Sequence, residues 1–151
     1  MSRSSRRLVT VLAVATVAST LAACGGSKDD GGGGGSGSNE ASDTGITADS
    51  IKIGSHYPLT GVAAPGYSTI PLGAQAYFDY VNDNGGVNGR KIEWDYKDDG
   101  YNPTTTSQVV NQLVLEDEVF AIMGGLGTPT HSAVVDFLNS EGVPDLFVAS
   151  G

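Results

Sequence analysis

Four short apolar segments alternate along the chain with segments whose apolar residues recur at helical spacing, and this alternation limits what the chain can fold into. The strand-like segments are 51–57, 91–96, 119–123 and 146–148. Strands that alternate with helices over short connections form parallel sheets with right-handed crossovers. The sequence therefore predicts an α/β fold, a parallel sheet with flanking helices. The residues expected on the buried helix faces are Ala74, Tyr77, Phe78 and Val81, then Val109, Val110, Leu113 and Val114, and then Ala133, Val134, Phe137 and Leu138.

Turn and cap residues separate these segments. Asn84-Gly85-Gly86 and Gly142 tolerate the left-handed backbone that ends many helices. Pro103 suits the first turn of the second helix. Thr128 is expected to cap the third helix, with Pro129 just inside it.

The first 23 residues have the layout of a secretory signal peptide. A basic segment, Met1–Arg7, precedes an apolar run, Leu8–Ala23, that is shorter than the roughly 20 residues of a membrane span. Leu21-Ala22-Ala23-Cys24 resembles the lipobox of bacterial lipoproteins, which implies that Cys24 is lipidated and becomes the new N-terminus. The alternative is an ordinary signal peptide that contains a cysteine.

Residues 24–46 are rich in Gly and Ser and lack apolar periodicity, as in the run Gly31–Gly35. Such a segment does not bury enough apolar surface to order itself. We therefore predict a flexible tether over 24–46 and a folded part over 47–151.

The mature chain is strongly acidic. Without the signal's Arg3, Arg6 and Arg7, 5 of the 8 basic residues remain against 17 acidic ones, a net charge of −12. Phosphate contacts need a basic face, so we expect no nucleic acid partner.

The folded part resembles the type I periplasmic binding proteins of the branched-chain amino acid (leucine-binding) family. Members of that family have two lobes and several hundred residues, so the resemblance implies the first part of lobe 1 and an N-terminal fragment. The chain alone would supply one wall of the ligand cleft. The resemblance covers Ile46–Gly151 and rests on four motifs, which are Ile46–Gly54, Pro58–Gly61, Asn84–Ile92 and Asp98–Pro103.

This resemblance implies a solute-binding lipoprotein of an ABC importer and not an enzyme. It would be anchored to the outer face of the cell membrane through Cys24 and deliver an amino acid or similar small polar solute (branched-chain amino acid, amide or urea type) to ABC permease subunits. Two alternatives remain open, a ligand sensor of the same fold and a lipidated α/β enzyme.

In an open α/β sheet, ligands bind at the carboxyl ends of the strands. This rule points to the loops 58–61, 125–130 and 149–151. The resemblance adds that Thr128 matches a hydroxyl residue that binds the ligand carboxylate; the alternative for Thr128 is a plain helix cap. The predicted ligand-binding residues are Thr60, Tyr67, Gly127, Thr128, Ala149, Ser150 and Gly151.

Other polar residues show no pattern that indicates chemistry. His56 and His131 are single histidines far apart in the sequence, without metal-ligand spacing to other residues. Asp95, Asp98 and Asp99 are interpreted as a strand end and a turn rather than a cation site. We therefore predict no metal site, no catalytic residues and no cofactor.

Overall fold

A computed structural model describes residues 39–150 of the chain. The predicted signal peptide, Cys24, the tether up to residue 38 and Gly151 lie outside these described residues. None of the helices in the described part is long and apolar enough to cross a membrane. The elements are β1 (Ser50–Tyr57), α1 (Ala64–Tyr67), α2 (Ile70–Asp83), β2 (Lys91–Asp98), α3 (Pro103–Leu115), β3 (Ala121–Met123), α4 (Thr128–Ser132), α5 (Val135–Glu141) and β4 (Asp145–Leu146).

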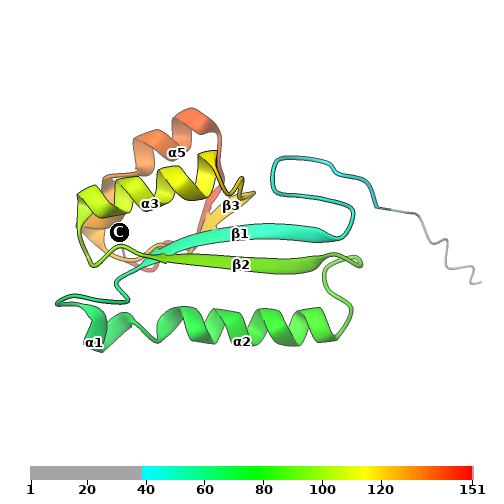
Figure 1. Cartoon of the computed structure of the whole chain (residues 1–151), viewed down its shortest axis with the longest axis horizontal. Helices are drawn as coiled ribbons and strands as arrows, with labels where there is room; N and C mark the ends of the chain where they lie inside the picture. The colour runs from blue at the N-terminus through cyan, green and yellow to red at the C-terminus, as the bar shows by residue number, and fades with distance from the viewer. Residues whose placement is uncertain (1–38, 151) are drawn as a thin grey trace, which may run out of the picture. The chain divides into compact units, whose positions relative to one another are not determined.

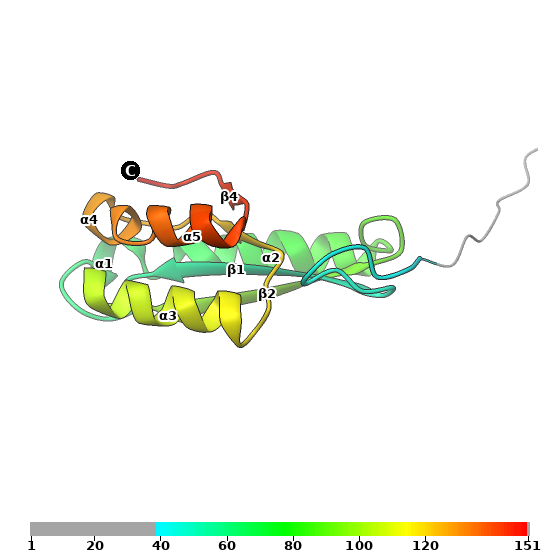
Figure 2. The ribbon, with the colours of Figure 1, turned by 90° about the horizontal axis from the view of Figure 1, so that it is seen from above.

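The strands form one parallel sheet in the order β2-β1-β3-β4. Ile53 of β1 is in register with Trp94 of β2 on one side and with Ala121 of β3 on the other. Helix α2 lies on one face of the sheet, and α3 and α5 lie on the other, as Figures 1 and 2 show. The predicted fold class, a parallel sheet with flanking helices, is confirmed.

The main core lies between the sheet and the helices α3 and α5. Leu113 and Ile122 are fully buried there, and each such side chain contributes about 1.5–3 kcal/mol by leaving water. The predicted buried faces at 109–114 and at 134 and 138 are therefore largely correct. The cluster consists of Val110, Leu113, Val114, Val119, Ile122, Val134 and Leu138.

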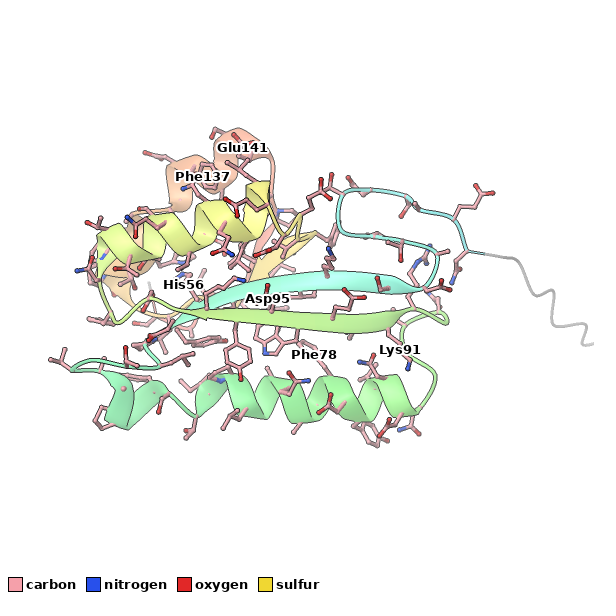
Figure 3. The ribbon with its side chains drawn as sticks, viewed as in Figure 1. His56, Phe78, Lys91, Asp95, Phe137 and Glu141 are labelled. Carbon is pink, nitrogen blue, oxygen red and sulfur yellow. The ribbon has the colours of Figure 1, made fainter. Side chains whose placement is uncertain are left out.

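The prediction for the buried face of α2 is wrong at Tyr77. Phe78 packs edge-on against Trp94 of β2, with ring centroids 5.3 Å apart, and points from α2 toward the sheet in Figure 3. Tyr77 is 63% exposed, whereas Phe78 is 8% exposed. Because α2 packs against β2, the edge strand of the sheet, nothing in the described chain covers the flank that carries Tyr77.

The predicted third helix is two short helices, α4 and α5, separated at Ala133–Val134. The cap of α4 is Gly127, with φ of 108°, and Thr128 is the first helical residue, so the prediction of Thr128 as cap is wrong. A φ of 108° is strained for any residue with a side chain, which explains why glycine occupies the cap position. Ala133, expected in the buried face, is exposed because it lies at this break.

The last residues of the predicted tether make contacts with the domain. Asn39 Nδ2 donates to the carbonyl of Asn88 at 2.7 Å, and Arg90 Nη2 donates to the carbonyl of Glu40 at 2.9 Å. Ile46 forms antiparallel bridges with Asp43 and with Ile51. The packed part of the chain therefore begins before Thr47, because backbone groups of 39–46 pair with the domain even though the segment has few apolar side chains.

Strand β4 is shorter than the predicted strand 146–148. Phe147 has a φ of 54° and is 82% exposed. This left-handed conformation takes the chain out of the extended geometry that strand pairing needs, so β4 ends at Leu146.

Candidate ligand-binding site

The loops that follow the strands lie at one edge of the sheet, because all the strands are parallel. In Figure 1 the strands β1 and β2 run toward the left, which is also the side on which the C-terminus of the described chain lies. Backbone contacts join these loops to one another. Ala149 N–H donates to the carbonyl of Gly125 at 3.0 Å, and Leu126 bridges Ser150 in parallel fashion. The loops after β3 and β4 therefore form one continuous surface.

Asp98, the last residue of β2, holds the loop after β1. Its Oδ1 accepts the backbone N–H groups of Leu59 at 2.9 Å, Thr60 at 3.1 Å and Gly100 at 3.0 Å. Its Oδ2 accepts the Thr60 hydroxyl at 2.5 Å. Burial raises the pKa of Asp98, but the hydrogen bonds from Thr60, Gly100 and Leu59 outweigh it and hold that pKa below its ordinary value. Asp98 in its ionised form thus holds the loop after β1 in place.

The glycine turn after β3 is tightly packed beneath the surface. Thr130 is fully buried, and its hydroxyl donates to the carbonyl of Leu126 at 2.7 Å, while the carbonyl of Gly127 lies 2.9 Å away. A side chain at Gly127 would collide with Thr130 and with the ring of Tyr101. The turn is therefore held from below, and Thr128 is exposed above it.

The structure places some, but not all, of the predicted ligand-binding residues on the surface of the loops at the carboxyl edge of the sheet. Thr60, Thr128 and Ser150 are exposed on the loops at the carboxyl edge of the sheet, whereas Gly127 is buried. Tyr67 is 46% exposed and lies at the end of the single-turn helix α1, which is joined to the first loop by a hydrogen bond from Ala64 N–H to the carbonyl of Gly61 at 3.3 Å. Ala149 is exposed beside Ser150, and Gly151 lies outside the described residues.

Sequence reasoning missed a row of four titratable side chains below these loops. His56 Nδ1 lies 2.8 Å from Asp99 Oδ2, His56 Nε2 lies 3.3 Å from His131 Nδ1, and His131 Nε2 lies 2.8 Å from Asp145 Oδ2. Sequence spacing carried no signal, because successive members of the row are 43, 75 and 14 residues apart. We call Asp99, His56, His131 and Asp145 the acid–histidine row.

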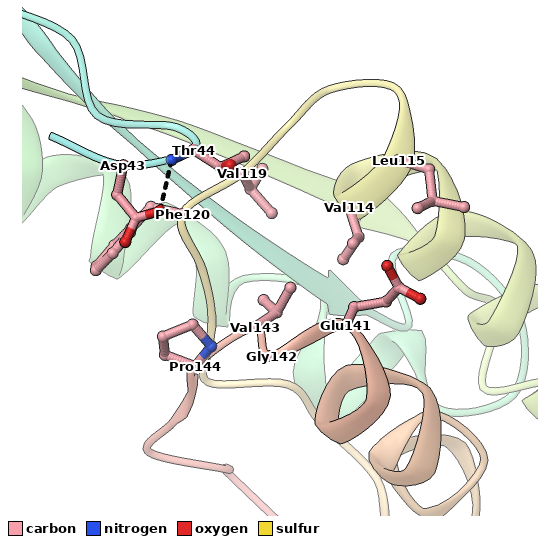
Figure 4. Close-up of a pocket in the computed structure, with 10 residues that line it drawn as sticks. All are labelled: Asp43, Thr44, Val114, Leu115, Val119, Phe120, Glu141, Gly142, Val143 and Pro144. Carbon is pink, nitrogen blue, oxygen red and sulfur yellow. Dashed lines mark hydrogen bonds between the residues drawn. The ribbon is translucent and has the colours of Figure 1, made fainter. Parts of the chain in front are cut away.

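A cavity of about 260 Å³ lies at the opposite edge of the sheet (Figure 4). Its lining comes from segments that precede β1 and β3, from the end of α3 and from the residues between α5 and β4. The cavity is therefore at the amino ends of the strands and is not part of the candidate site. Its lining residues are Asp43, Thr44, Val114, Leu115, Val119, Phe120, Glu141, Gly142, Val143 and Pro144.

Among residues 39–150 no group of three or more His, Cys, Asp and Glu side chains is arranged to hold a metal ion.

Comparison with known proteins decides the family. The family model described as "Periplasmic binding protein" matches residues 50–151, which is most of the chain. The chain belongs to this family. The expected resemblance to leucine-binding proteins is confirmed by a relative from Pseudomonas aeruginosa, the leucine-, isoleucine-, valine-, threonine-, and alanine-binding protein. It is 32% identical over 98 residues, which cover 65% of this chain and 26% of the relative.

Two solved structures of the family share the fold. The fatty acid ABC transporter substrate-binding protein from Thermomonospora curvata is 35% identical, with a TM-score of 0.61 over 72% of this chain and 27% of that one. The branched-chain amino acid transporter substrate-binding protein from Streptococcus pneumoniae, solved with isoleucine, is 30% identical, with a TM-score of 0.61 over 64% of this chain and 28% of that one. The chain thus spans about a quarter of the length of these family members.

Proposed function

We propose that the complete protein, meaning this chain extended to the length of its relatives, is the extracytoplasmic solute-binding component of an ABC importer. The observation that carries the proposal is the position of the exposed Thr128 and Ser150 on two joined loops at the carboxyl edge of the sheet. Ligands of open α/β sheets bind at this edge. The family match favours binding over catalysis.

The proposed ligand is a small carboxylate, of which an amino acid is the leading case. The relatives named above bind leucine-type amino acids or a fatty acid, and both classes carry a carboxylate. The hydroxyls of Thr128 and Ser150 are donors suited to such a group. Thr60 already gives its hydroxyl hydrogen to Asp98, so toward a ligand its oxygen is an acceptor, as an ammonium group requires.

The membrane part of the proposal rests on sequence. A lipid on Cys24 would hold the protein at the outer face of the cell membrane, and ABC permease subunits would receive the ligand.

Calorimetry of the complete protein with matched ligand pairs tests this function. Leucine and leucinamide differ in the carboxylate, and leucine and isocaproate differ in the ammonium group. We expect saturable heat with at least one amino acid or fatty acid and none with its amide. Binding of urea or amides alone would contradict a carboxylate ligand, and no saturable heat with any carboxylate, amide or urea would contradict the solute-binding function.

A further inference from the structure

The acid–histidine row crosses the sheet in strand order. Asp99 follows β2, His56 belongs to β1, His131 lies in α4 after β3, and Asp145 begins β4. Figure 3 shows His56 near the end of β1, beneath α3. The side chains of His56 and Asp99 are fully buried, and those of His131 and Asp145 are 6% and 22% exposed. The row thus links all the strands on the side that α3 covers.

The three contacts of the row require three protons. Each link joins two atoms that both carry lone pairs unless one of them is protonated. Two neutral imidazoles between two carboxylates supply two protons, which leaves one link without a hydrogen. Hydrogen bonds at all three links therefore require one proton more than two neutral histidines provide. The central link, at 3.3 Å, is longer than the outer links at 2.8 Å.

The carboxylates at the two ends favour this extra proton on the histidines. Asp99 also accepts the backbone N–H of Tyr101 at 2.8 Å, and the Thr106 hydroxyl lies 3.2 Å from its Oδ2. On the same face of the sheet, Lys97 of β2 is in register with His56, and its ammonium group is paired with Asp95 and with Asp117 at 3.0 Å each. Helix α3 has no charged residue, His131 is the only titratable residue of α4, and Asp136 and Glu141 of α5 are exposed.

The central link lies directly beneath the glycine turn after β3. A Cβ at Gly125 would lie 2.5 Å from His56 Nε2 and 2.9 Å from His131 Nδ1, so the backbone of the turn rests on these two atoms. Two phenols also lie at the turn, that of Tyr57, which would be 2.8 Å from a Cβ at Gly124, and that of Tyr101, whose ring packs against Gly127. Leu126 N–H donates to the carbonyl of His56 at 3.3 Å, and His131 N–H donates to the carbonyl of Gly127 at 2.7 Å. The turn is therefore in close contact with both imidazoles and is bonded to the backbone of both histidines.

We propose that His56 and His131 share one proton and act as positioning residues for the turn Gly124–Thr128, which carries Thr128 to the ligand. The role in ligand positioning rests on the proposed function, whereas the shared proton does not. Without this proton, two lone pairs face each other in a site from which water is excluded. The imidazoles then separate, and the turn above them loses its support.

Nitrogen-15 spectra of the full chain, labelled in histidine, count the protons directly. We expect three protonated ring nitrogens in the row at about pH 5 and two after the pH has been raised into the range where histidines lose charge. Two protonated ring nitrogens at every pH between about 5 and 9 would overturn the proposal. This measurement needs no variant, so it decides the question even if every substitution in the row prevents folding.

A matched pair of variants tests what holds the proton. Asp145→Asn keeps the shape of the side chain but removes one carboxylate, and Asp83→Asn removes an exposed carboxylate at the end of α2, outside the row. In the wild type, the melting temperature should fall as rising pH removes the shared proton. Asp145→Asn should move this fall to lower pH, whereas Asp83→Asn should leave it unchanged. Asp145→Glu should restore at least part of the wild-type profile. Identical pH profiles for wild type and Asp145→Asn would contradict the proposal.

Ligand binding separates this inference from the proposed function. In the complete protein, ligand affinity should fall over the same pH range in which the third ring proton disappears. Three ring protons in a protein that binds no carboxylate would overturn the function but leave the row intact. A ligand affinity that is unchanged while the ring proton is lost would overturn the positioning role alone.

Discussion

The Thr60 hydroxyl donates to the Asp98 carboxylate at 2.5 Å, so a residue of the first loop is bound to the last residue of the neighbouring strand. Two backbone N–H groups of the same loop donate to this carboxylate. The loop after β1 is therefore held by one ionised side chain, and the stability of the fold should depend on that charge.

Replacing Asp98 should give a pH-dependent loss of stability. The pKa of Asp98 is lower in the folded chain than in the unfolded chain. The stabilisation of the fold by this carboxylate is therefore complete above the unfolded-state pKa and is lost as the pH falls through the folded-state pKa. We expect Asp98→Asn to lower the free energy of unfolding by about 1–2 kcal/mol at pH 7. This difference should shrink below about pH 4. Urea unfolding between pH 3 and 7 measures it, with Asp83→Asn as control. An equal loss at both ends of that range would contradict the role of the charge.

Truncation of Phe78 should destabilise the fold, whereas truncation of its neighbour on α2, Tyr77, should have little effect. Phe78→Ala removes the ring that packs on Trp94 and should cost about 3 kcal/mol, the lower end for a buried aromatic residue. Tyr77→Ala removes an exposed ring and should change the free energy of unfolding by less than about 0.5 kcal/mol. Denaturant unfolding of both variants measures this. A large loss in Tyr77→Ala would show that another part of the protein covers this flank of α2.

Thr128 should matter for ligand binding more than for folding. Because Gly127 and not Thr128 caps α4, Thr128→Ala should leave the melting temperature nearly unchanged. In the complete protein it should weaken binding of the carboxylate ligand by roughly 1–3 kcal/mol, which is the effect of one lost hydrogen bond to a charged group. Thr104→Ala, at an exposed threonine in the first turn of α3, is the matched control. Equal affinities of the two variants would exclude Thr128 from the ligand contacts.

Lipidation of Cys24 can be tested by fractionation of cells. Cys24→Ala should release the protein from membranes into the medium, because the anchor would be the acyl chains on this thiol. Mass spectrometry of the wild-type N-terminus should find the acylated cysteine. A Cys24→Ala protein that stays with the membrane, or a wild-type Cys24 without acyl chains, would rule out the predicted anchor.

Part of the candidate site could be predicted from the sequence. The alternation of strands and helices, read from residue spacing, led to a parallel sheet and so to ligand loops at its carboxyl edge. The glycine turn and the loop of Thr60 were predicted in this way, whereas Thr128 was singled out by the resemblance to leucine-binding proteins. The prediction of Thr128 as a helix cap was wrong. Threonine is a good cap residue, but the turn requires a positive φ at the cap position, and Gly127, the residue before Thr128, occupies that position.

Local patterns of the sequence therefore determined the alternation of the main strands and helices, and with it the edge at which we propose that a ligand binds, because such patterns act within one helix or strand. Only the tertiary structure decided that Tyr77 is exposed, since its burial depends on whether a neighbour covers the flank of α2. It also decided the acid–histidine row. The order β2-β1-β3-β4 brings Asp99, His56, His131 and Asp145 into one line, and residues that meet through strand order leave no periodic signal along the chain.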